Sequence, residues 1–210
     1  MLTLYGAKGS GAAAIEAALR LAGVEYRRVD AASWQPGPGL DALKRINPLA
    51  QVPTLVLDDG AVLTESSAML IELALRHPAS GLLPALPSRR AQAIRGLAYI
   101  GANCYAAIGV IDYPERWCAP CDDELAKRIG AGTRVRLYQL WDIFADTFPA
   151  TPYLSGERIG ALDLLAAVVS RWSGTRAHLK QSRPRFHALL QTIECEPRVA
   201  SVFEAHWPTQ

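Results

Sequence analysis

The stretch Asn47-Pro-Leu-Ala-Gln-Val-Pro-Thr-Leu-Val-Leu-Asp-Asp-Gly-Ala-Val-Leu-Thr-Glu-Ser-Ser67 decides how the chain folds. An apolar, β-rich run at 54–57 leads into Asp58-Asp59-Gly60, and Asp-Gly suits the positive dihedrals of a tight hairpin turn. Residues 61–63 form the return strand. Thr64 to Ser67 then opens a helix, where small oxygen-bearing side chains accept hydrogen bonds from free backbone N–H groups. The stretch therefore predicts a β-hairpin that leads directly into a helix.

Val52-Pro53 stands at the entrance of this hairpin, where a proline cannot donate a ladder hydrogen bond. Only about 5–6% of X–Pro bonds in folded proteins are cis, so a trans strand-entry proline is the plain alternative. A cis bond would turn the Val52 N–H and C=O away from the sheet and toward a ligand. The helix N-terminus that follows would offer N–H groups and a positive dipole end to an anion. Together these features predict a surface for the backbone and carboxylate of a small peptide.

The residues Asn47-Pro48, Gln51 to Leu55 and Glu65 to Ala68 resemble the glutathione-binding half of the cytosolic glutathione S-transferases, in particular a bacterial glutathione S-transferase-like protein. The family pattern extends over essentially all 210 residues. The resemblance implies a thioredoxin-like N-terminal domain followed by an all-helical C-terminal domain. It also implies glutathione as a co-substrate with no prosthetic group, a small electrophile as second substrate, a homodimer and a role in detoxification.

Composition argues against several other classes of protein. Hydrophobic residues make up 50% and charged residues 20% of the chain, an ordinary balance for a soluble globular protein. The formal net charge is +2 and no run of five Lys or Arg residues occurs, so nothing indicates nucleic-acid binding. The start lacks the basic and apolar segments of a signal peptide, and no run of 18 apolar residues indicates a membrane span. We therefore expect a cytoplasmic protein without nucleic-acid or membrane partners, whose four cysteines are reduced.

The order of the elements predicted in the first 76 residues matches a thioredoxin-like domain. The elements are a strand at 2–5, a helix at 12–21, a strand at 24–29, a helix at 40–46, strands at 54–57 and 61–63, and a helix at 65–76. The first crossover implies parallel pairing of the two strands that it joins. Gly23 is expected to stop the first helix as a C′ glycine, and Glu16 to pair with Arg20 on its surface.

Residues 77–87 are predicted to be a linker because they contain three prolines, and no strand pattern follows them. Residues 88–210 are predicted to form an all-α domain, with helices at 88–111, 123–148, 161–172, 185–194 and 199–206. The resemblance gives this domain the pocket for the acceptor substrate. The family usually has Ser or Thr before the third of these helices. Gly160 stands there instead, and Asp163 is expected to accept a hydrogen bond from its N–H as half of a capping box.

Catalysis by such an enzyme requires a group that favours the glutathione thiolate, because a free thiol has a pKa of about 8.5. A helix N-terminus and hydrogen-bond donors lower a thiol pKa, so the donor is expected between the first strand and the first helix. Ser10 lies there, beside the N–H groups of Gly11 and Ala12, although it could equally be a plain helix cap. Tyr5 is the competing donor, and its alternative role is a core-facing strand residue. No cysteine occurs between residues 6 and 14, which argues against the thiol-exchange branch of the family.

The resemblance assigns the glutathione tripeptide to the hairpin and the following helix. Glu65 pairs with the free amine, the hydroxyl and N–H of Ser66 bind the γ-glutamyl carboxylate, and the backbone at Val52-Pro53 pairs with the cysteinyl portion. Gln51 and Lys44 reach the glycyl carboxylate. The simpler alternatives are an ordinary helix start at Glu65 and a solvated helix face at Lys44.

One face of the helix predicted at 88–111 carries candidates for the acceptor pocket, because this helix walls that pocket in the family. Tyr99 and Asn103, with Trp117 just after the helix, are predicted to line it. The alternative role for all three is packing within the helical domain. Tyr105 and Trp172 are weaker candidates for the same pocket.

Cys118-Ala-Pro-Cys121 could be a redox pair or part of a metal site. A thioredoxin-type pair belongs at the end of the first strand, however, and a zinc site needs two further ligands that the spacing of the four histidines does not supply. We therefore predict an incidental pair of reduced cysteines and no metal site.

The sequence thus predicts a glutathione S-transferase in which the bound thiolate attacks a small hydrophobic electrophile. Two alternatives share the same glutathione site, namely a glutathione-dependent isomerase or dehalogenase and a non-catalytic, transferase-like binding module. A disulfide-bond reductase that uses Cys118 and Cys121 is a third alternative.

Overall fold

The computed structural model of the chain describes residues 1–208 and contains a four-stranded mixed sheet in the order β2-β1-β3-β4. The strands are β1 (Leu2–Gly6), β2 (Tyr26–Asp30), β3 (Thr54–Val56) and β4 (Val62–Leu63). β1 runs parallel to β2 and antiparallel to β3, and β3 and β4 form the hairpin. The predicted parallel crossover and the predicted hairpin are therefore both confirmed.

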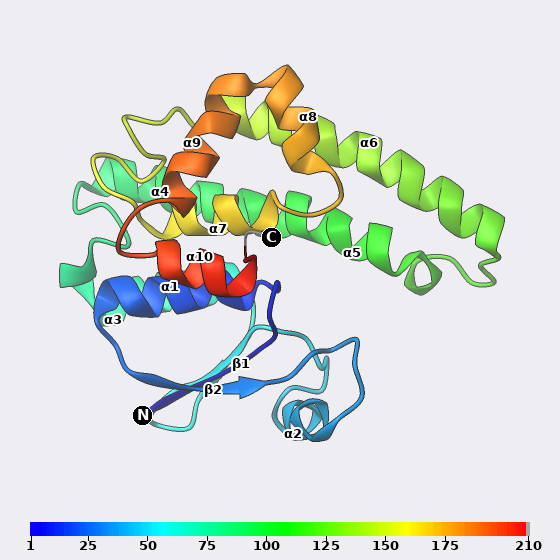
Figure 1. The fold of residues 1–210 in the computed structure, drawn as a ribbon, viewed down its shortest axis with the longest axis horizontal. Coiled ribbons are helices and arrows are strands. Elements are labelled where there is room, and N and C mark those ends of the chain that lie inside the picture. The colour runs from blue at the N-terminus through cyan, green and yellow to red at the C-terminus, as the bar shows by residue number, and fades with distance from the viewer. Residues whose placement is uncertain (209–210) are drawn as a thin grey trace.

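Helices cover both faces of this sheet (Figure 1). α1 (Ala12–Ala22) and α3 (Ser66–Arg76) pack on the face to which Leu4 and Leu55 point, and α2 (Pro38–Ile46) packs on the other face with Tyr5. Side chains alternate between the faces of a strand, so Leu4 and Tyr5 must separate in this way. The arrangement is the thioredoxin-like fold that the element order predicts.

Helix α1 confirms one local prediction and overturns another. Gly23 has a φ of 66° and its N–H bonds to the carbonyl of Arg20, as expected of a C′ glycine. The predicted pair of Glu16 with Arg20 is wrong. Glu16 is buried and contacts His206 of the last helix, whereas Arg20 Nε donates to the carbonyl of Arg198 at 2.8 Å. Long-range packing has displaced the local ion pair.

The second half of the chain is helical. Its elements are the 3₁₀ turn η1 (Pro78–Ser80), α4 (Pro87–Tyr99), the π-helical segment η2 (Ile100–Tyr105), α5 (Ala106–Asp112), the 3₁₀ turn η3 (Pro114–Arg116), α6 (Asp123–Thr147), α7 (Ala161–Val169), α8 (Thr175–Ser182), α9 (Pro184–Glu194) and α10 (Ala200–His206). The helix predicted at 88–111 is continuous from 87 to 112 but contains the π-helical segment. Helix α8 was not predicted. The domain boundaries at residues 76 and 88 stay a prediction.

Helix α7 lies at the centre of the molecule, and all nine of its residues are buried (Figure 1). Its start is fixed by Asp163, which is fully buried and accepts N–H bonds from Leu154, Ser155 and Gly160 at 2.8, 3.0 and 3.0 Å. The predicted bond from the Gly160 N–H is thereby confirmed. A Cβ at Gly160 would lie 2.7 Å from both the Leu82 carbonyl oxygen and Ser155 Oγ, which explains why glycine replaces the family's serine or threonine.

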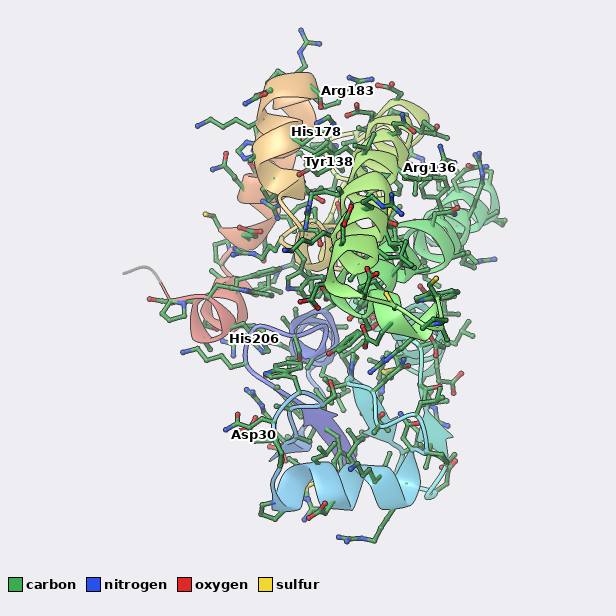
Figure 2. The ribbon with its side chains drawn as sticks, turned by 90° about the vertical axis from the view of Figure 1, so that its right-hand side faces the viewer. Asp30, Arg136, Tyr138, His178, Arg183 and His206 are labelled. Atoms are coloured by element: carbon green, nitrogen blue, oxygen red, sulfur yellow. The ribbon has the colours of Figure 1, made fainter. Side chains whose placement is uncertain are left out.

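A polar cluster joins α8 to α6 (Figure 2). Asp142 Oδ1 lies 3.0 Å from His178 Nε2 and accepts a hydrogen bond from Ser182 Oγ at 2.7 Å. The His178 ring stacks on the Tyr138 ring, with the ring centroids 4.5 Å apart. Ser182 Oγ also lies 3.1 Å from His178 Nε2, the same ring nitrogen that faces Asp142. In a catalytic triad the carboxylate and the hydroxyl contact opposite nitrogens of the imidazole, whereas here both contact Nε2, so the cluster docks one helix on the other and is not a triad.

The continuous helix from Pro87 to Asp112 is long and apolar enough, by length and composition, to cross a membrane, with a mean hydropathy of 1.3 in its most apolar window. A membrane span was not expected, because no run of 18 consecutive apolar residues occurs in the sequence. In the structure this helix packs against α6 and α7, and the Tyr99 hydroxyl bonds to the Leu140 carbonyl of α6.

Candidate functional site

Four segments meet at the N-terminus of α1: the β1–α1 loop, the start of β3, the start of α3 and the π-helical segment η2. Gly11 marks the meeting point. A Cβ at Gly11 would overlap the Tyr105 hydroxyl and would lie 3.1 Å from Cδ of Pro53. A residue with a side chain would therefore displace Tyr105 from the helix start, and only glycine leaves room for it.

The peptide bond between Val52 and Pro53 is cis, as predicted for this corner. Within residues 1–208, neither the N–H nor the C=O of Val52 has a hydrogen-bond partner. A buried network holds the segment, because Asn47 Nδ2 donates to Thr54 Oγ1 at 2.9 Å and Thr54 Oγ1 donates to the Gln51 carbonyl at 2.8 Å. The Asn-Pro and Val-Pro-Thr motifs thus fix each other and leave the Val52 backbone free to pair with a ligand.

The start of α3 also presents polar groups that are free to bind a ligand. Its N-cap residue is Glu65, which has a φ of 62°, is exposed and makes no capping bond with its side chain. Ser66 is only 8% exposed, and its hydroxyl has no partner in the described part of the chain. Ser67 Oγ donates to the Leu97 carbonyl at 2.8 Å and ties this helix start to α4. The first N–H groups of a helix lack intrahelical acceptors, so the start of α3 is suited to an anion.

Ser10 is buried and its hydroxyl is engaged within its own loop. Ser10 Oγ donates to the Ala7 carbonyl at 2.6 Å and accepts the N–H groups of Ala7 and Ala12, each at 3.2 Å. The N–H of Gly11, by contrast, has no partner among residues 1–208. In this arrangement Ser10 fixes the shape of the loop, and the Gly11 N–H is the group left free.

Tyr5 lies on the opposite side of the sheet from α1. It packs with Leu40 and Leu43 in the small cluster beneath α2, and Val52 packs against the same cluster. The structure therefore brings Tyr5 near the backbone of the β3 entrance but not to the N-terminus of α1, where Ser10 lies.

Tyr105 is the aromatic residue of the helical half that reaches the N-terminus of α1. It is the last residue of the π-helical segment, and its ring packs on Trp172 with the centroids 5.5 Å apart. Its hydroxyl has no hydrogen-bond partner within residues 1–208. Burial raises the pKa of Tyr105 to about 12, and the charges of Glu65 and Asp112 act in the same direction. The phenol therefore stays protonated at neutral pH and has a proton to donate to a ligand.

The remaining predicted site residues are more dispersed. Gln51 and Lys44 are both exposed, the first before β3 and the second on α2. Tyr99 packs on Phe144, and Asn103 Nδ2 donates to the Tyr99 carbonyl at 3.1 Å. Trp117 is 66% exposed. The two weaker candidates, Tyr105 and Trp172, pack on each other, and the predicted role of Tyr99, Asn103 and Trp117 in the acceptor pocket stays a prediction.

The two cysteines of the Cys118-Ala-Pro-Cys121 motif lie after α5, far along the chain from the N-terminus of α1. Both are free thiols and half-buried, and burial with the neighbouring charges raises the pKa of Cys121. No group of three or more metal-ligating side chains occurs among residues 1–208. A raised thiol pKa opposes thiolate chemistry at this position.

Residues 12–76 match the family model described as glutathione S-transferase, N-terminal domain. A solved glutathione transferase from Methylococcus capsulatus is 30% identical, with 98% of each chain covered and a TM-score of 0.74. The chain belongs to the glutathione S-transferase family. A glutathione transferase homologue from Sulfitobacter, solved with bound glutathione, is 26% identical over 96% of each chain, with a TM-score of 0.82.

Two curated relatives of this transferase family member also match. The uncharacterized GST-like protein YncG of Escherichia coli is 29% identical over 97% of this chain and 98% of its own length. The probable maleylacetoacetate isomerase of Caenorhabditis elegans is 44% identical over 79 residues, which are 38% of this chain and 35% of that protein. The first similarity spans the whole fold, and the second is local.

Two residues near this site were not among the main predicted site residues: Tyr105, which was a weaker candidate, and His206, which was not a candidate. Tyr105 was a weak candidate because a regular helix gives no reason to turn that side chain toward α1, and the π-helical segment is not visible in the composition. His206, which contacts the β1–α1 loop, carries no motif. One signal points to it: Glu16 stands among apolar residues of α1, whose other charged residue is Arg20, and a buried carboxylate requires a partner.

Proposed function

We propose that the protein is a glutathione transferase, in which the thiolate of bound glutathione attacks a small hydrophobic electrophile to form a thioether. The observation that carries the proposal is the convergence of three unused backbone donor sites, at Val52, Gly11 and the start of α3, around one corner of the sheet. The glutathione complex of the Sulfitobacter homologue supports glutathione as the ligand.

Each part of the tripeptide has a counterpart in this corner. The N–H and C=O of Val52 pair with the cysteinyl backbone as a short strand-like bridge. The Ser66 hydroxyl and the N–H groups at the start of α3 bind the γ-glutamyl carboxylate, and Glu65 pairs with the free amine. Gln51 and Lys44 bind the glycyl carboxylate from the solvent side.

The thiol then lies at the N-terminus of α1. We propose that the free N–H of Gly11 and the hydroxyl of Tyr105 donate to the thiolate, because both groups lack partners in the protein. Ser10 can become a further donor if it releases the Ala7 carbonyl, which costs a hydrogen bond with a net value of about 1 kcal/mol. Tyr5, beneath α2, is the less favoured alternative. The acceptor substrate lies against Tyr105 and Trp172 in this account, and not against Tyr99, whose hydroxyl is bound to α6.

Glutathione-dependent conjugation of an activated aryl halide tests the proposal. Ser66→Ala removes a donor to a bound carboxylate, an interaction that contributes roughly 1.5–3 kcal/mol, so we expect the KM for glutathione to rise about tenfold or more. The matched control is Glu72→Gln on the same helix, where Glu72 pairs with the exposed side of Arg76; here the KM should not change. A wild-type protein that produces no thioether, or a Ser66→Ala variant with an unchanged KM, would contradict the proposal.

The local similarity to a probable isomerase supports glutathione-dependent isomerisation as a second candidate. The two reactions differ in the fate of glutathione, because a transferase consumes one molecule per turnover and an isomerase regenerates it. Counting free thiols during turnover separates them. If the protein binds glutathione but converts neither type of substrate, it is instead the non-catalytic, transferase-like binding module. We also propose a homodimer, as the family resemblance implies, and light scattering of the purified protein measures its mass directly.

A further inference from the structure

The C-terminal helix α10 lies against the loop that leads into α1 (Figures 1 and 2). Its last residue, His206, is 2% exposed and contacts two elements of the N-terminal half at once. The Gly9 N–H donates to His206 Nδ1 at 3.1 Å, and His206 Nε2 lies 3.0 Å from Glu16 Oε1. Gly9 directly precedes Ser10 and Gly11. The imidazole therefore bridges the loop at the N-terminus of α1 and the body of that helix.

The two contacts allow only one form of the imidazole. A backbone N–H can only donate, so Nδ1 must present its lone pair to Gly9, and the ring proton must then sit on Nε2 and be donated to Glu16. Glu16 is a suitable acceptor. Burial opposes its ionisation, but the bond from His206 and the charge of Arg28 hold the pKa of Glu16 below its usual value.

Neighbouring groups fix both ends of this bridge. Glu16 also accepts a bond from the Tyr26 hydroxyl at 3.1 Å and lies 3.5 Å from Arg28 Nη1, so its carboxylate cannot turn away. On the loop side, Gly9 has a φ of 73°, and a Cβ there would lie 3.6 Å from Trp207 Nε1. The guanidinium of Arg171 stacks 4.4 Å from the Trp207 ring and holds the end of α10 in place.

We infer that His206 is a positioning residue for the thiol site. By binding the Gly9 N–H, it sets the path of the backbone into Ser10 and Gly11, and so the direction in which the Gly11 N–H points. It touches neither substrate in this arrangement and acts through the loop. Its catalytic consequence rests on the proposed function, whereas the bridge itself does not.

A pair of variants separates the two halves of the bridge. In His206→Asn, Oδ1 occupies the position of Nδ1 and can still accept from Gly9, whereas the donor to Glu16 is lost. In His206→Gln, the terminal amide reaches Glu16, but no acceptor remains at the δ position for Gly9. We expect His206→Gln to raise the thiol pKa of bound glutathione by about half a unit, the size of a partly lost helix-terminus interaction. His206→Asn should leave that pKa near the wild-type value.

A second readout does not depend on glutathione. In the wild-type protein, ¹⁵N spectra should show an unprotonated Nδ1 and a protonated Nε2 for His206, with a hydrogen-bond coupling between Nδ1 and the Gly9 amide. The Gly9 amide should exchange with solvent faster in His206→Gln than in His206→Asn. Equal exchange rates of the Gly9 amide in the two variants would overturn the inference. So would a wild-type ring protonated on Nδ1, a result that can be obtained even if one variant does not fold. If the protein binds no glutathione, only the proposed function fails, and the amide readouts still decide whether the bridge exists.

Discussion

Replacing Asp163 with alanine is expected to lower the free energy of unfolding by about 3 kcal/mol or more. Asp163 accepts the N–H groups of Leu154, Ser155 and Gly160, and the variant leaves two buried donors and one half-buried donor without an acceptor. Each unsatisfied buried donor costs roughly 1–3 kcal/mol. Burial raises the pKa of Asp163, so the ionised carboxylate is held at some cost at neutral pH, and its removal offsets a part of this loss. Urea unfolding followed by circular dichroism measures the difference.

The control for this variant is Asp41→Ala, which removes an exposed carboxylate on α2 that makes no side-chain hydrogen bond within residues 1–208. This variant should lower the free energy of unfolding by less than about 1 kcal/mol. Asp163→Asn keeps one acceptor oxygen, so its loss of stability should lie between those of Asp41→Ala and Asp163→Ala. An Asp163→Ala protein as stable as Asp41→Ala would show that the start of α7 does not depend on this carboxylate.

The second large effect is expected for Tyr105→Phe, measured as the thiol pKa of bound glutathione from the ultraviolet absorbance of the thiolate. A hydrogen bond to a charged group contributes roughly 1.5–3 kcal/mol, and one pKa unit corresponds to about 1.4 kcal/mol. Loss of the phenol should therefore raise the thiol pKa by about 1–2 units, with a matching loss of kcat/KM at neutral pH. Because the Tyr105 pKa is raised to about 12, the phenol itself should not titrate in this range.

Two further variants identify the donor. Tyr5→Phe alters a ring beneath α2 and should leave the thiol pKa unchanged. Ser10→Ala should affect chiefly the stability of the loop, because its hydroxyl is engaged with Ala7. A larger pKa rise in Ser10→Ala than in Tyr105→Phe would make Ser10 the principal donor and would contradict the role given to Tyr105.

The features that were predicted correctly are those encoded by short local patterns. The hairpin, the cis bond before Pro53 and the start of α3 all follow from residues that are close in sequence. The same is true of the bond between Asp163 and the Gly160 N–H, which are three residues apart. Such patterns act through backbone geometry, which the sequence encodes directly.

The features that were missed depend on contacts between distant segments. Glu16 was expected to pair with Arg20, yet its partner His206 lies 190 residues further along the chain. Tyr105 is turned toward α1 by a π-helical segment, for which the helical pattern gives no signal. Helix α8 is mostly polar and is held by the cluster of Asp142, His178 and Ser182, so it lacks the apolar periodicity from which helices are predicted. In each case tertiary packing outweighed local propensity.

The central claim is that this corner of the sheet binds glutathione through the backbone of Val52 and the start of α3. Titration with glutathione, followed in the ¹H–¹⁵N spectrum of the wild-type protein, tests it most directly. The account predicts saturable binding with a Kd of about 1 mM or tighter, a free energy near −4 kcal/mol, with the largest shifts at the amides of Gly11, Val52 and Ser66. Spectra that do not change, or shifts confined to amides remote from these three, would contradict it.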